Sequence, residues 1–240
     1  MYPANLIVFT LCLAPSIESA SSQRRNKWSK ARVGEGVSVE AHIIYDSSVK
    51  PQGLSERNND ERKNEDTLAD FKKLFQLVQQ HFHNESVMVT FEVKTAIQND
   101  TLPVKSGNKS LNATQTLKKL IEYAAVNSSR NDSIFYFFTA NELLEKTKQG
   151  DKVDIDHADV ATFGTFCSEK DSAAVVKYYP LSDTTRHISA VEATARIFGL
   201  KKYKNLNIRD ILQLLLTFGN CPRSDCWTQC LQPVDETDGN

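Results

Sequence analysis

The sequence predicts a single α/β domain built on a mixed sheet, with a leader before it and a cysteine-containing tail after it. Strand-length apolar runs alternate with segments whose apolar residues recur at helical spacing, and this alternation is typical of α/β proteins. The run Ser133–Ala140 is apolar almost throughout, as in a strand at the centre of a sheet. Hydrophobic residues make up 40% of the 240 residues, which is enough for one substantial core.

The first half of the domain is expected to form a strand, a helix and a second strand. Val37–Tyr45 alternates and then becomes wholly apolar, which indicates a strand buried toward its end. Asp66–Phe82 carries apolar residues three and four positions apart, which predicts a helix. Ser86–Ile97 is expected to be the second strand, because apolar and polar residues alternate along it. The apolar residues on its one face are Val87, Val89, Phe91 and Val93.

A second helix and three further strands are expected next. Ala113–Val126 has one apolar face, which predicts a helix. Ser133–Ala140 is the expected central strand, and Val160–Phe166 and Ala173–Tyr179 are expected to be a further pair of edge strands. The residues on the buried side of the helix are Leu117, Leu120, Ile121 and Ala124.

Two late helices complete the predicted domain. Thr184–Leu200 is expected to be helical, with Asp183 or Thr184 as its N-cap. Asn207–Phe218 is the last predicted helix, and the cysteine-containing tail follows it.

Residues 1–20 are typical of a secretory signal peptide. Leu6–Ala14 is apolar but too short to span a bilayer as a helix, and a segment of small residues follows it. Cleavage is expected between Ser16 and Ala20. We therefore expect a secreted, extracellular protein with a basic flexible arm at 21–36, a domain at 37–221 and a tail at 222–240. No other run is long enough to be a membrane span.

The balance of charge argues against nucleic acid and acidic lipid as partners. The formal net charge is −1, which creates no long-range field for polyanions. No nucleophile elbow, phosphate-binding loop or dinucleotide fingerprint occurs in the sequence either.

Cysteines and sequons agree with an extracellular protein. Four cysteines remain after the leader, which implies two bridges with three possible connectivities. These cysteines are Cys167, Cys221, Cys226 and Cys230. Six N-glycosylation sequons lie between residues 84 and 133, and the side of the domain that carries glycans is not expected to be a binding face. Their asparagines are Asn84, Asn99, Asn108, Asn112, Asn127 and Asn131.

Four segments carry a family resemblance. Val39–Ser48 is a strand that ends near an aspartate, Asp132–Thr139 is an apolar strand, Ala161–Cys167 contains a glycine before a cysteine, and Ile208–Leu215 is a helix shortly before Cys221. In this order they resemble the reprolysin-type metalloproteases, especially the secreted salivary ones of blood-feeding ticks. The resemblance implies a metzincin-like domain with a mixed, mostly parallel sheet, an antiparallel edge strand, packed helices and a disulfide-bonded C-terminal tail. We also expect Cys167 to reach the C-terminal cysteines, and the other two to pair locally.

The helix that carries the chemistry in this family reads H-E-x-x-H-x-x-G-x-x-H, with three zinc ligands and a glutamate as general base. Aligned on Gly199, the ligand positions fall on Glu192, Arg196 and Lys202, and the base position falls on Ala193. Arginine has no lone pair to give, and lysine would have to lose its proton. The resemblance therefore implies a degenerate site that holds no zinc. Glu192 and Arg196 are expected instead to form an ion pair on the helix surface.

Two further observations support the interpretation that the site holds no zinc. A shift of the alignment by one residue makes Glu192 the base, but it makes Val191 and Ala195 the first two ligands, and neither has a donor atom. The family's methionine turn is also missing, since Tyr203–Asn207 is all that separates the last two predicted helices. Met88 lies far upstream, in a predicted strand.

Other clusters of metal-binding residue types favour structural roles. An acidic cluster lacks the glycine and the distal glutamate of an EF-hand loop, so a solvated loop is favoured over a calcium site. It consists of Asp151, Asp154, Asp156, His157 and Asp159. His81 and His83 are expected to cap the C-terminus of their helix rather than bind metal, and His187 is expected to be structural.

The function expected from the resemblance is that of a non-catalytic, secreted glycoprotein that binds a host protein. The expected binding surface lies around Glu192, Arg196 and an edge strand near Val175. One alternative is an active zinc endopeptidase with atypical ligands such as His187 or His157. A second alternative is a small-ligand carrier such as a lipocalin, although that fold would show about eight alternating strands.

Overall fold

The computed structural model describes residues 32–50, 60–107, 109–128, 130–146, 152–154, 159–180 and 183–222, all in one unit that begins at Arg32. The predicted leader, the predicted arm up to Ala31, and Cys226 and Cys230 lie outside these residues. Among the helices in the described part of the chain, none is both long and apolar enough to cross a membrane.

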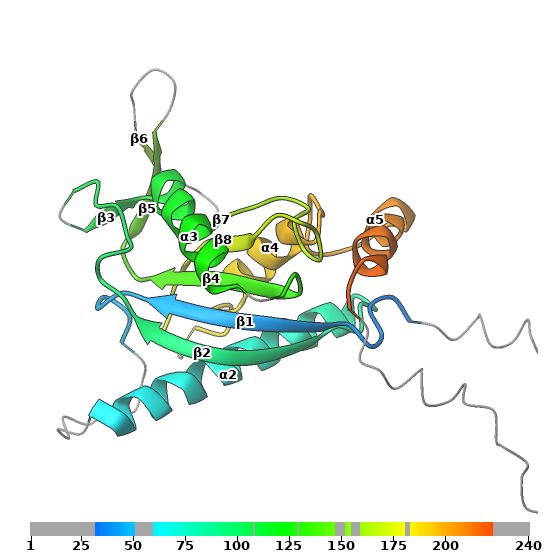
Figure 1. Cartoon of the computed structure of the whole chain (residues 1–240), viewed down its shortest axis with the longest axis horizontal. Helices are drawn as coiled ribbons and strands as arrows, with labels where there is room; N and C mark the ends of the chain where they lie inside the picture. Colours follow the sequence, from blue (N-terminus) through cyan, green and yellow to red (C-terminus); the bar gives the residue numbers. More distant parts are fainter. Residues whose placement is uncertain are drawn as a thin grey trace, which may run out of the picture. The chain divides into compact units, whose positions relative to one another are not determined.

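A five-stranded sheet forms the centre of the fold (Figure 1). Four strands run parallel, and the fifth is antiparallel at one edge. This confirms the predicted α/β class and the mostly parallel sheet with an antiparallel edge strand. In spatial order the strands are β2 (Thr90–Gln98), β1 (Ser38–Tyr45), β4 (Ser133–Thr139), β8 (Ser172–Lys177) and β7 (Asp159–Ala161).

The pairing of β1 with β2 contains a bulge. Ala41 pairs with Val93, and the register then shifts so that Lys94 has no partner in the ladder. An extra residue of this kind bends a strand and interrupts its alternation. The predicted alternation of buried and exposed residues therefore continues only as far as Val93. Ile97, beyond the bulge, is 47% exposed.

Helices cover both faces of the sheet (Figure 1). On one face, α2 (Asp60–Asn84), α4 (Ile188–Ile197) and α5 (Ile208–Gly219) contribute to the larger of two buried cores. On the opposite face, α3 (Ala113–Asn127) covers the smaller core. The four helices predicted from apolar periodicity are thus all present, because each one has an apolar stripe that is buried against the sheet.

Aromatic side chains connect α2 to the sheet and to the end of α4. The rings of Phe71 and Phe75 lie against Phe138 and Tyr136, with centroids 5.0 and 4.9 Å apart. Phe82, in the last turn of α2, packs against Phe198 with ring centroids 5.5 Å apart. Burial of an aromatic side chain contributes about 2 kcal/mol, so this cluster is a main source of the domain's stability.

A small second sheet was not expected from the sequence. It consists of β3 (Ser110–Asn112), β5 (Glu142–Lys146) and β6 (Lys152–Asp154). β3 runs parallel to β5, and β6 runs antiparallel to it. Strands of three to five residues are too short to show an alternating pattern, so periodicity does not reveal them.

Asparagine residues are the N-caps of two of the helices. Oδ1 of Asn112 accepts a hydrogen bond from the backbone N–H of Gln115 at the start of α3. Asn207 accepts from the N–H of Asp210, whose carboxylate accepts from the N–H of Asn207 in return. This reciprocal capping box fixes the start of α5, where the sequence placed it.

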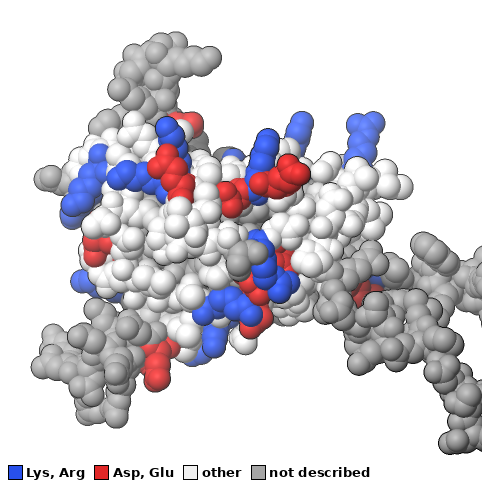
Figure 2. Space-filling view, viewed as in Figure 1, with Lys and Arg blue, Asp and Glu red and all other residues white. Residues whose placement is uncertain are grey.

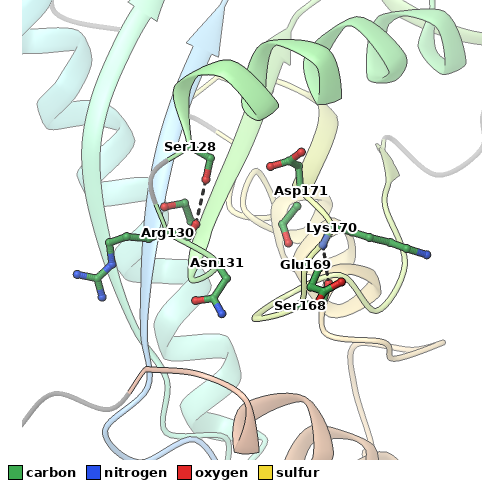
Figure 3. A pocket seen from close by; sticks show the side chains of 9 residues that line it. Ser128, Arg130, Asn131, Ser168, Glu169, Lys170 and Asp171 are labelled. Atoms are coloured by element: carbon green, nitrogen blue, oxygen red, sulfur yellow. Dashed lines mark hydrogen bonds between the residues drawn. The ribbon is translucent and has the colours of Figure 1, made fainter.

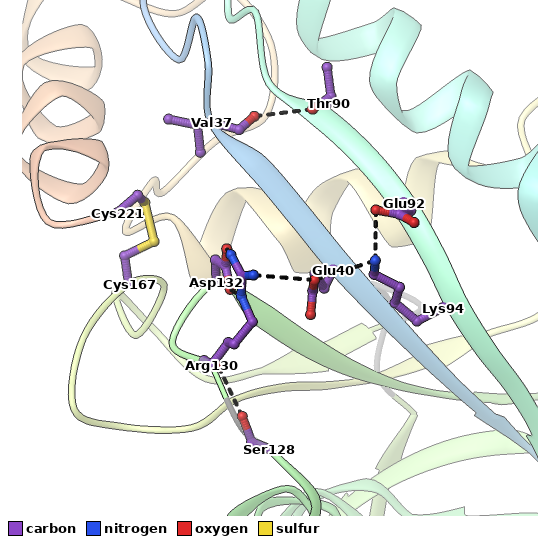
Figure 4. A network of polar contacts seen from close by, with 10 residues as sticks. All are labelled: Val37, Glu40, Thr90, Glu92, Lys94, Ser128, Arg130, Asp132, Cys167 and Cys221. Atoms are coloured by element: carbon purple, nitrogen blue, oxygen red, sulfur yellow. Dashed lines mark hydrogen bonds and ion pairs between the residues drawn. A yellow bond between two sulfur atoms is a disulfide. The ribbon is translucent and has the colours of Figure 1, made fainter. Parts of the chain in front are cut away.

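A disulfide joins Cys167 to Cys221, with Cα atoms 4.9 Å apart (Figure 4). It connects the loop between β7 and β8 to the residues just after α5. This agrees with the expected link between Cys167 and the C-terminal cysteines.

A network of charged side chains connects β1, β2 and the residues just before β4 (Figure 4). The ammonium group of Lys94 is 3.4 Å from Glu40 and 2.8 Å from Glu92. The guanidinium of Arg130 donates to both carboxylate oxygens of Asp132, at 2.8 and 2.6 Å. The buried Asp132 carboxylate is therefore compensated by a two-pronged ion pair.

The surface shows no field of a single sign on the face in Figure 2, where basic and acidic side chains are interspersed with uncharged areas. This agrees with the near-zero net charge.

Helix α5 exposes a stripe of apolar side chains. These are Ile208, Leu212, Leu215 and Leu216.

Candidate functional site at helix α4

Helix α4 is shorter at its start than the sequence predicts. It begins at Ile188 after a turn at 184–187, and neither Asp183 nor Thr184 is its N-cap. The Asp183 carboxylate accepts hydrogen bonds from the N–H and hydroxyl of Thr185, so it closes the turn instead. His187 occupies the N-cap position, and its side chain makes no capping hydrogen bond.

Most of α4 is buried, including the position that aligns with a catalytic base. Ala193 is fully buried in the larger core. Its neighbour Thr194 donates to the Ala190 carbonyl and lies 2.8 Å from the Tyr136 hydroxyl. Burial raises the pKa of Tyr136, so this phenol stays neutral. The methyl group of Ala193 therefore points into the domain, where a glutamate would have no access to solvent.

Arg196 forms an ion pair, but not with its helical neighbour. Its Nε lies 3.6 Å from Oδ2 of Asp159 on the edge strand β7. The Asp159 side chain is fully buried, whereas 43% of the Arg196 side chain is exposed. The described contacts contain no ion pair between Arg196 and Glu192, so the predicted surface pair is wrong. The edge strand brings a buried carboxylate closer to Arg196 than the preceding turn of α4 brings Glu192.

Asp159 changes its charge near neutral pH. Burial raises the pKa of its carboxyl to about 7, while the Arg196 cation lowers it and the Glu192 carboxylate raises it. Neither carboxylate oxygen accepts a hydrogen bond from any residue the structure describes. The carboxyl group is therefore held in a poorly solvated place and is compensated mainly by one guanidinium.

Lys202 lies in the loop after α4 and is already paired. Its ammonium group donates to the carbonyl of Asn205 at 2.6 Å and lies 3.2 Å from the Asp210 carboxylate. Gly199 ends the helix with a φ of 87°, a conformation that favours glycine. A Cβ atom there would also come within 2.9 Å of the Gln213 side chain.

Helix α4 and the loop after it enclose a pocket of about 230 Å³, which we call the α4 pocket. Its apolar wall includes Leu200 and Ala195, both almost fully buried. The polar residues that line it are Glu192, Arg196, Lys201, Lys202, Tyr203 and Lys204. Three of the four positions aligned with zinc chemistry thus come together here, and Ala193 does not join them.

The residues of the α4 pocket do not fit a zinc ion. Protein zinc sites use thiolate, imidazole and carboxylate donors, with at least three from the protein. Of the residues that line the pocket, only Glu192 has such a group, and Arg196 and Lys202 place cations beside it. Throughout the described ranges, no three His, Cys, Asp or Glu side chains are grouped as metal ligands.

The histidines contact backbone carbonyls instead of a metal. Nε2 of His81 donates to the carbonyl of Tyr203 at 3.0 Å, and Nε2 of His83 donates to that of Val89 at 2.9 Å. Both carbonyls belong to other segments, so these side chains fasten α2 to its surroundings rather than cap its own last turn. Burial lowers the pKa of His187, whose ring lies 6.2 Å from that of His81.

A buried ion pair beside the start of α4 was not found by sequence reasoning. Nη1 of Arg186 donates to Oδ1 of Asp70 on α2 at 3.1 Å, and the Tyr178 hydroxyl donates to Oδ2 at 2.8 Å. Both charged side chains are at most 5% exposed. Asp70 lies on the same face of α2 as the buried residues Phe71 and Leu74. Helical periodicity could therefore have predicted that its carboxylate is buried.

The acidic cluster is only partly described, and one of its members is not solvated. The prediction of a solvated loop is wrong for Asp159, because its side chain is buried between β7 and α4. Asp154 lies in β6. Asp151, Asp156 and His157 lie outside the described residues.

Val175 does not belong to an edge strand, so that part of the predicted binding surface is wrong. It lies in β8, between β4 and β7, and its side chain is fully buried. It also belongs to the core covered by α3, on the opposite face of the sheet from α4. The edge beside α4 is formed by β7.

A second cleft, of about 260 Å³, lies near the amino ends of β4 and β8 (Figure 3). Arg130 and Lys170 extend away from one another on its two sides, so their charges do not converge. The other polar residues in its lining include Ser128, Asn131 and Ser168. Because Asn131 is the acceptor of a sequon, a glycan on it would lie at this cleft.

The predicted glycosylation sites differ in exposure. Asn84, Asn127 and Asn131 are exposed, whereas Asn99 and Asn112 are half-buried and use Oδ1 in local hydrogen bonds. The remaining sequon asparagine, at position 108, lies outside the described residues.

No model of a known protein family matches the chain, and no curated protein does. Among solved structures, metalloproteinase-II from Bacteroides fragilis is 10% identical, with a TM-score of 0.46 over 78% of this chain and 55% of its own. Archaemetzincin from Archaeoglobus fulgidus, in complex with malonate, is 14% identical, with a TM-score of 0.36 over 72% and 91%. A zinc-dependent peptidase from Methanocorpusculum labreanum is 12% identical, with a TM-score of 0.35 over 72% and 92%. This chain spans about half the length of the first structure. Similarity this distant does not bear on activity or metal content.

Proposed function

We propose that this chain is a secreted, non-catalytic glycoprotein, a degenerate member of the tick salivary reprolysin-like metalloproteases, which binds a host protein through the surface around α4. The proposal takes the family and the compartment from the sequence resemblance and the signal-peptide pattern. It takes the loss of catalysis from the chemistry of the α4 pocket.

One observation carries the proposal: Arg196, at an aligned ligand position, is paired with the buried Asp159 carboxylate. Lys202, at a second aligned ligand position, pairs with the Asp210 carboxylate and donates a hydrogen bond to the carbonyl of Asn205. A divalent cation in this pocket would be repelled by both side chains. Without the metal there is no activated water, since Ala193 offers no base. Binding therefore remains as the function of this surface.

The α4 surface is favoured over the second cleft for two reasons. It carries the one arginine of the pocket with much of its side chain exposed next to an apolar wall, and arginine is among the residue types enriched at protein interfaces. The second cleft instead contains a sequon asparagine. In addition, the sheet is mostly parallel, unlike the antiparallel barrel of a lipocalin-type carrier.

The test is to express the whole chain in a secretory host, purify it from the medium and measure its zinc content and peptidase activity. We expect glycosylated protein in the medium, far less than one zinc ion per chain and no chelator-sensitive cleavage of peptides. One zinc ion per chain together with chelator-sensitive cleavage would establish the atypical endopeptidase instead.

A further inference from the structure

The guanidinium of Arg196 is held at the wall of the α4 pocket with part of its hydrogen-bonding capacity unused. Asp159 approaches Nε, and 43% of the side chain is exposed. Within the part of the chain that the structure describes, Nη1 and Nη2 donate no hydrogen bond to another residue, although the guanidinium as a whole is paired with Asp159. A guanidinium has five N–H donors arranged as a planar fork, and the edge formed by Nη1 and Nη2 matches the two oxygens of a carboxylate.

Asp159, on the interior side of Arg196, helps to hold the guanidinium in this orientation. Its side chain is fully buried, and its oxygens accept no hydrogen bond from a described residue. A buried carboxylate without hydrogen bonds costs folding free energy, so it does not contribute as an ordinary stabilising pair. When this carboxyl is ionised, its attraction orients the guanidinium from the interior and reduces the number of conformations that Arg196 would lose on binding.

The remaining charges of the pocket favour an anion of limited size. Lys201 and Lys204 are exposed at its rim, and the Lys204 ammonium lies 5.4 Å from the centre of the Tyr203 ring. Lys202 is compensated by Asp210, and Glu192 adds a negative charge to the lining. A long polyanion would meet this carboxylate, whereas a single carboxylate can approach Arg196 beside it.

The apolar part of the lining favours a peptide as the carrier of that carboxylate. Leu200 and Ala195 are 1% exposed, so the accessible apolar surface of the lining beside the guanidinium is mainly the half-buried ring of Tyr203. A glutamate side chain or an apolar neighbour on a peptide can bury hydrocarbon against this ring. The sulfate groups of a polysaccharide are separated by polar sugar rings, which gain little from it.

We propose that the α4 pocket binds a carboxylate of an acidic peptide segment of the partner protein, and that the guanidinium of Arg196 receives it. This inference rests on the proposed binding function and specifies the chemistry of the partner. In it, Arg196 is the contact residue and Asp159 is a positioning residue.

The probe for this inference is a fluorescein-labelled Glu-Leu-Glu-Leu-Glu peptide, titrated with the full-length glycosylated chain and followed by fluorescence anisotropy. The same peptide with glutamine in place of glutamate, and an amidated C-terminus, is the uncharged control. We expect saturable binding of the acidic peptide alone. Arg196→Ala should weaken it about tenfold or more, as expected for the loss of a charged hydrogen-bonded pair.

Arg209→Ala is the matched control, because Arg209 is an exposed arginine on α5 that does not line the pocket. It should change the affinity less than twofold, since it removes the same charge elsewhere. Arg196→Lys keeps the charge but loses the fork, and it should weaken binding nearly as much as Arg196→Ala. Lys204→Glu, at the exposed rim, provides a second test if the Arg196 variants fail to fold, and it should also weaken binding.

Three results would overturn the inference: no binding of the acidic peptide, equal loss in Arg196→Ala and Arg209→Ala, or binding of a heparin oligosaccharide in its place. The zinc and peptidase measurements are separate from these titrations. A zinc-free, inactive chain that does not bind the acidic peptide would overturn only the inference that the α4 pocket binds a carboxylate. A zinc-loaded chain that cleaves peptides would overturn the proposed function itself.

Discussion

Nε of Arg196 lies 3.6 Å from Oδ2 of Asp159, so the partly exposed Arg196 side chain near the end of helix α4 is connected to a fully buried carboxylate on the edge strand β7. This relationship occupies the helix that resembles a zinc-binding helix and fills one of its ligand positions with a cation. It also creates a group that titrates near neutral pH. Several measurable properties of the chain depend on it and on the packing around it.

The first prediction concerns the dependence of stability on pH. Burial raises the folded-state pKa of Asp159 to about 7, well above its value of 3.8 in the unfolded chain. Between these two pH values the folded state binds the proton and the unfolded state does not. The free energy of unfolding should therefore decrease as the pH rises from 4 to 7 and level off above it, with a slope of at most about 1.4 kcal/mol per pH unit.

Urea denaturation at pH 5, 6 and 8, on the wild type and on Asp159→Asn, measures this effect. The asparagine variant lacks the titrating group, so its stability relative to the wild type should increase as the pH rises. Parallel pH profiles for the two proteins would show that Asp159 does not titrate in this range.

The second prediction concerns the base position of the resembled motif. Ala193→Glu should lower the free energy of unfolding by about 3 kcal/mol or more, because it forces a carboxylate into a packed core. Glu192→Ala, on the adjacent half-buried position, should change it by less than about 1 kcal/mol. Thermal and chemical denaturation compare them, and a stable Ala193→Glu protein would contradict the inward orientation of this position.

The third prediction concerns the buried ion pair between Arg186 and Asp70. Arg186→Ala leaves the Asp70 carboxylate buried without its cation and should cost about 3–5 kcal/mol of stability. Lys202→Ala removes a partly exposed pair with Asp210 and should cost about 1 kcal/mol or less. Similar losses in both variants would contradict the difference in burial.

The fourth prediction concerns the disulfide. Cys167 and Cys221 are 54 residues apart, so their cross-link restricts a long loop of the unfolded chain. The double variant Cys167→Ser and Cys221→Ser should lose about 4 kcal/mol of stability. Equilibrium unfolding of the secreted proteins measures the loss. A double variant as stable as the wild type would indicate that the two cysteines are not bonded.

Much of the fold is readable from the sequence because its signals are local. The apolar stripe of each helix and the run Ser133–Thr139 each report how one segment is buried. Asn207 marks the start of α5 through a capping box that lies within four residues. The apolar runs at β7 and β8 predict a pair of strands for the same reason, although β7 is shorter than predicted and β8 lies in the interior of the sheet.

The errors concern interactions between segments distant in the sequence. Val175 and its neighbours carry no mark that distinguishes an interior strand from an edge strand, and the addition of β7 decides it. His81 has a helical position that suits a cap, but its ring donates to the carbonyl of Tyr203, 122 positions along the chain. The three short strands of the second sheet exist only because they pair with one another.

The sequence by itself determined the classes of residue at the α4 motif, and with them the chemistry that this helix lacks. An arginine has no lone pair to give, and a lysine has one only after it loses its proton. Only the tertiary structure decided that Arg196 is paired with Asp159 rather than with Glu192 and that Ala193 points inward. The choice of ion-pair partner depends on distance and burial, and the packing of β7 against α4 brings residues 159 and 196 together across 37 positions of the chain.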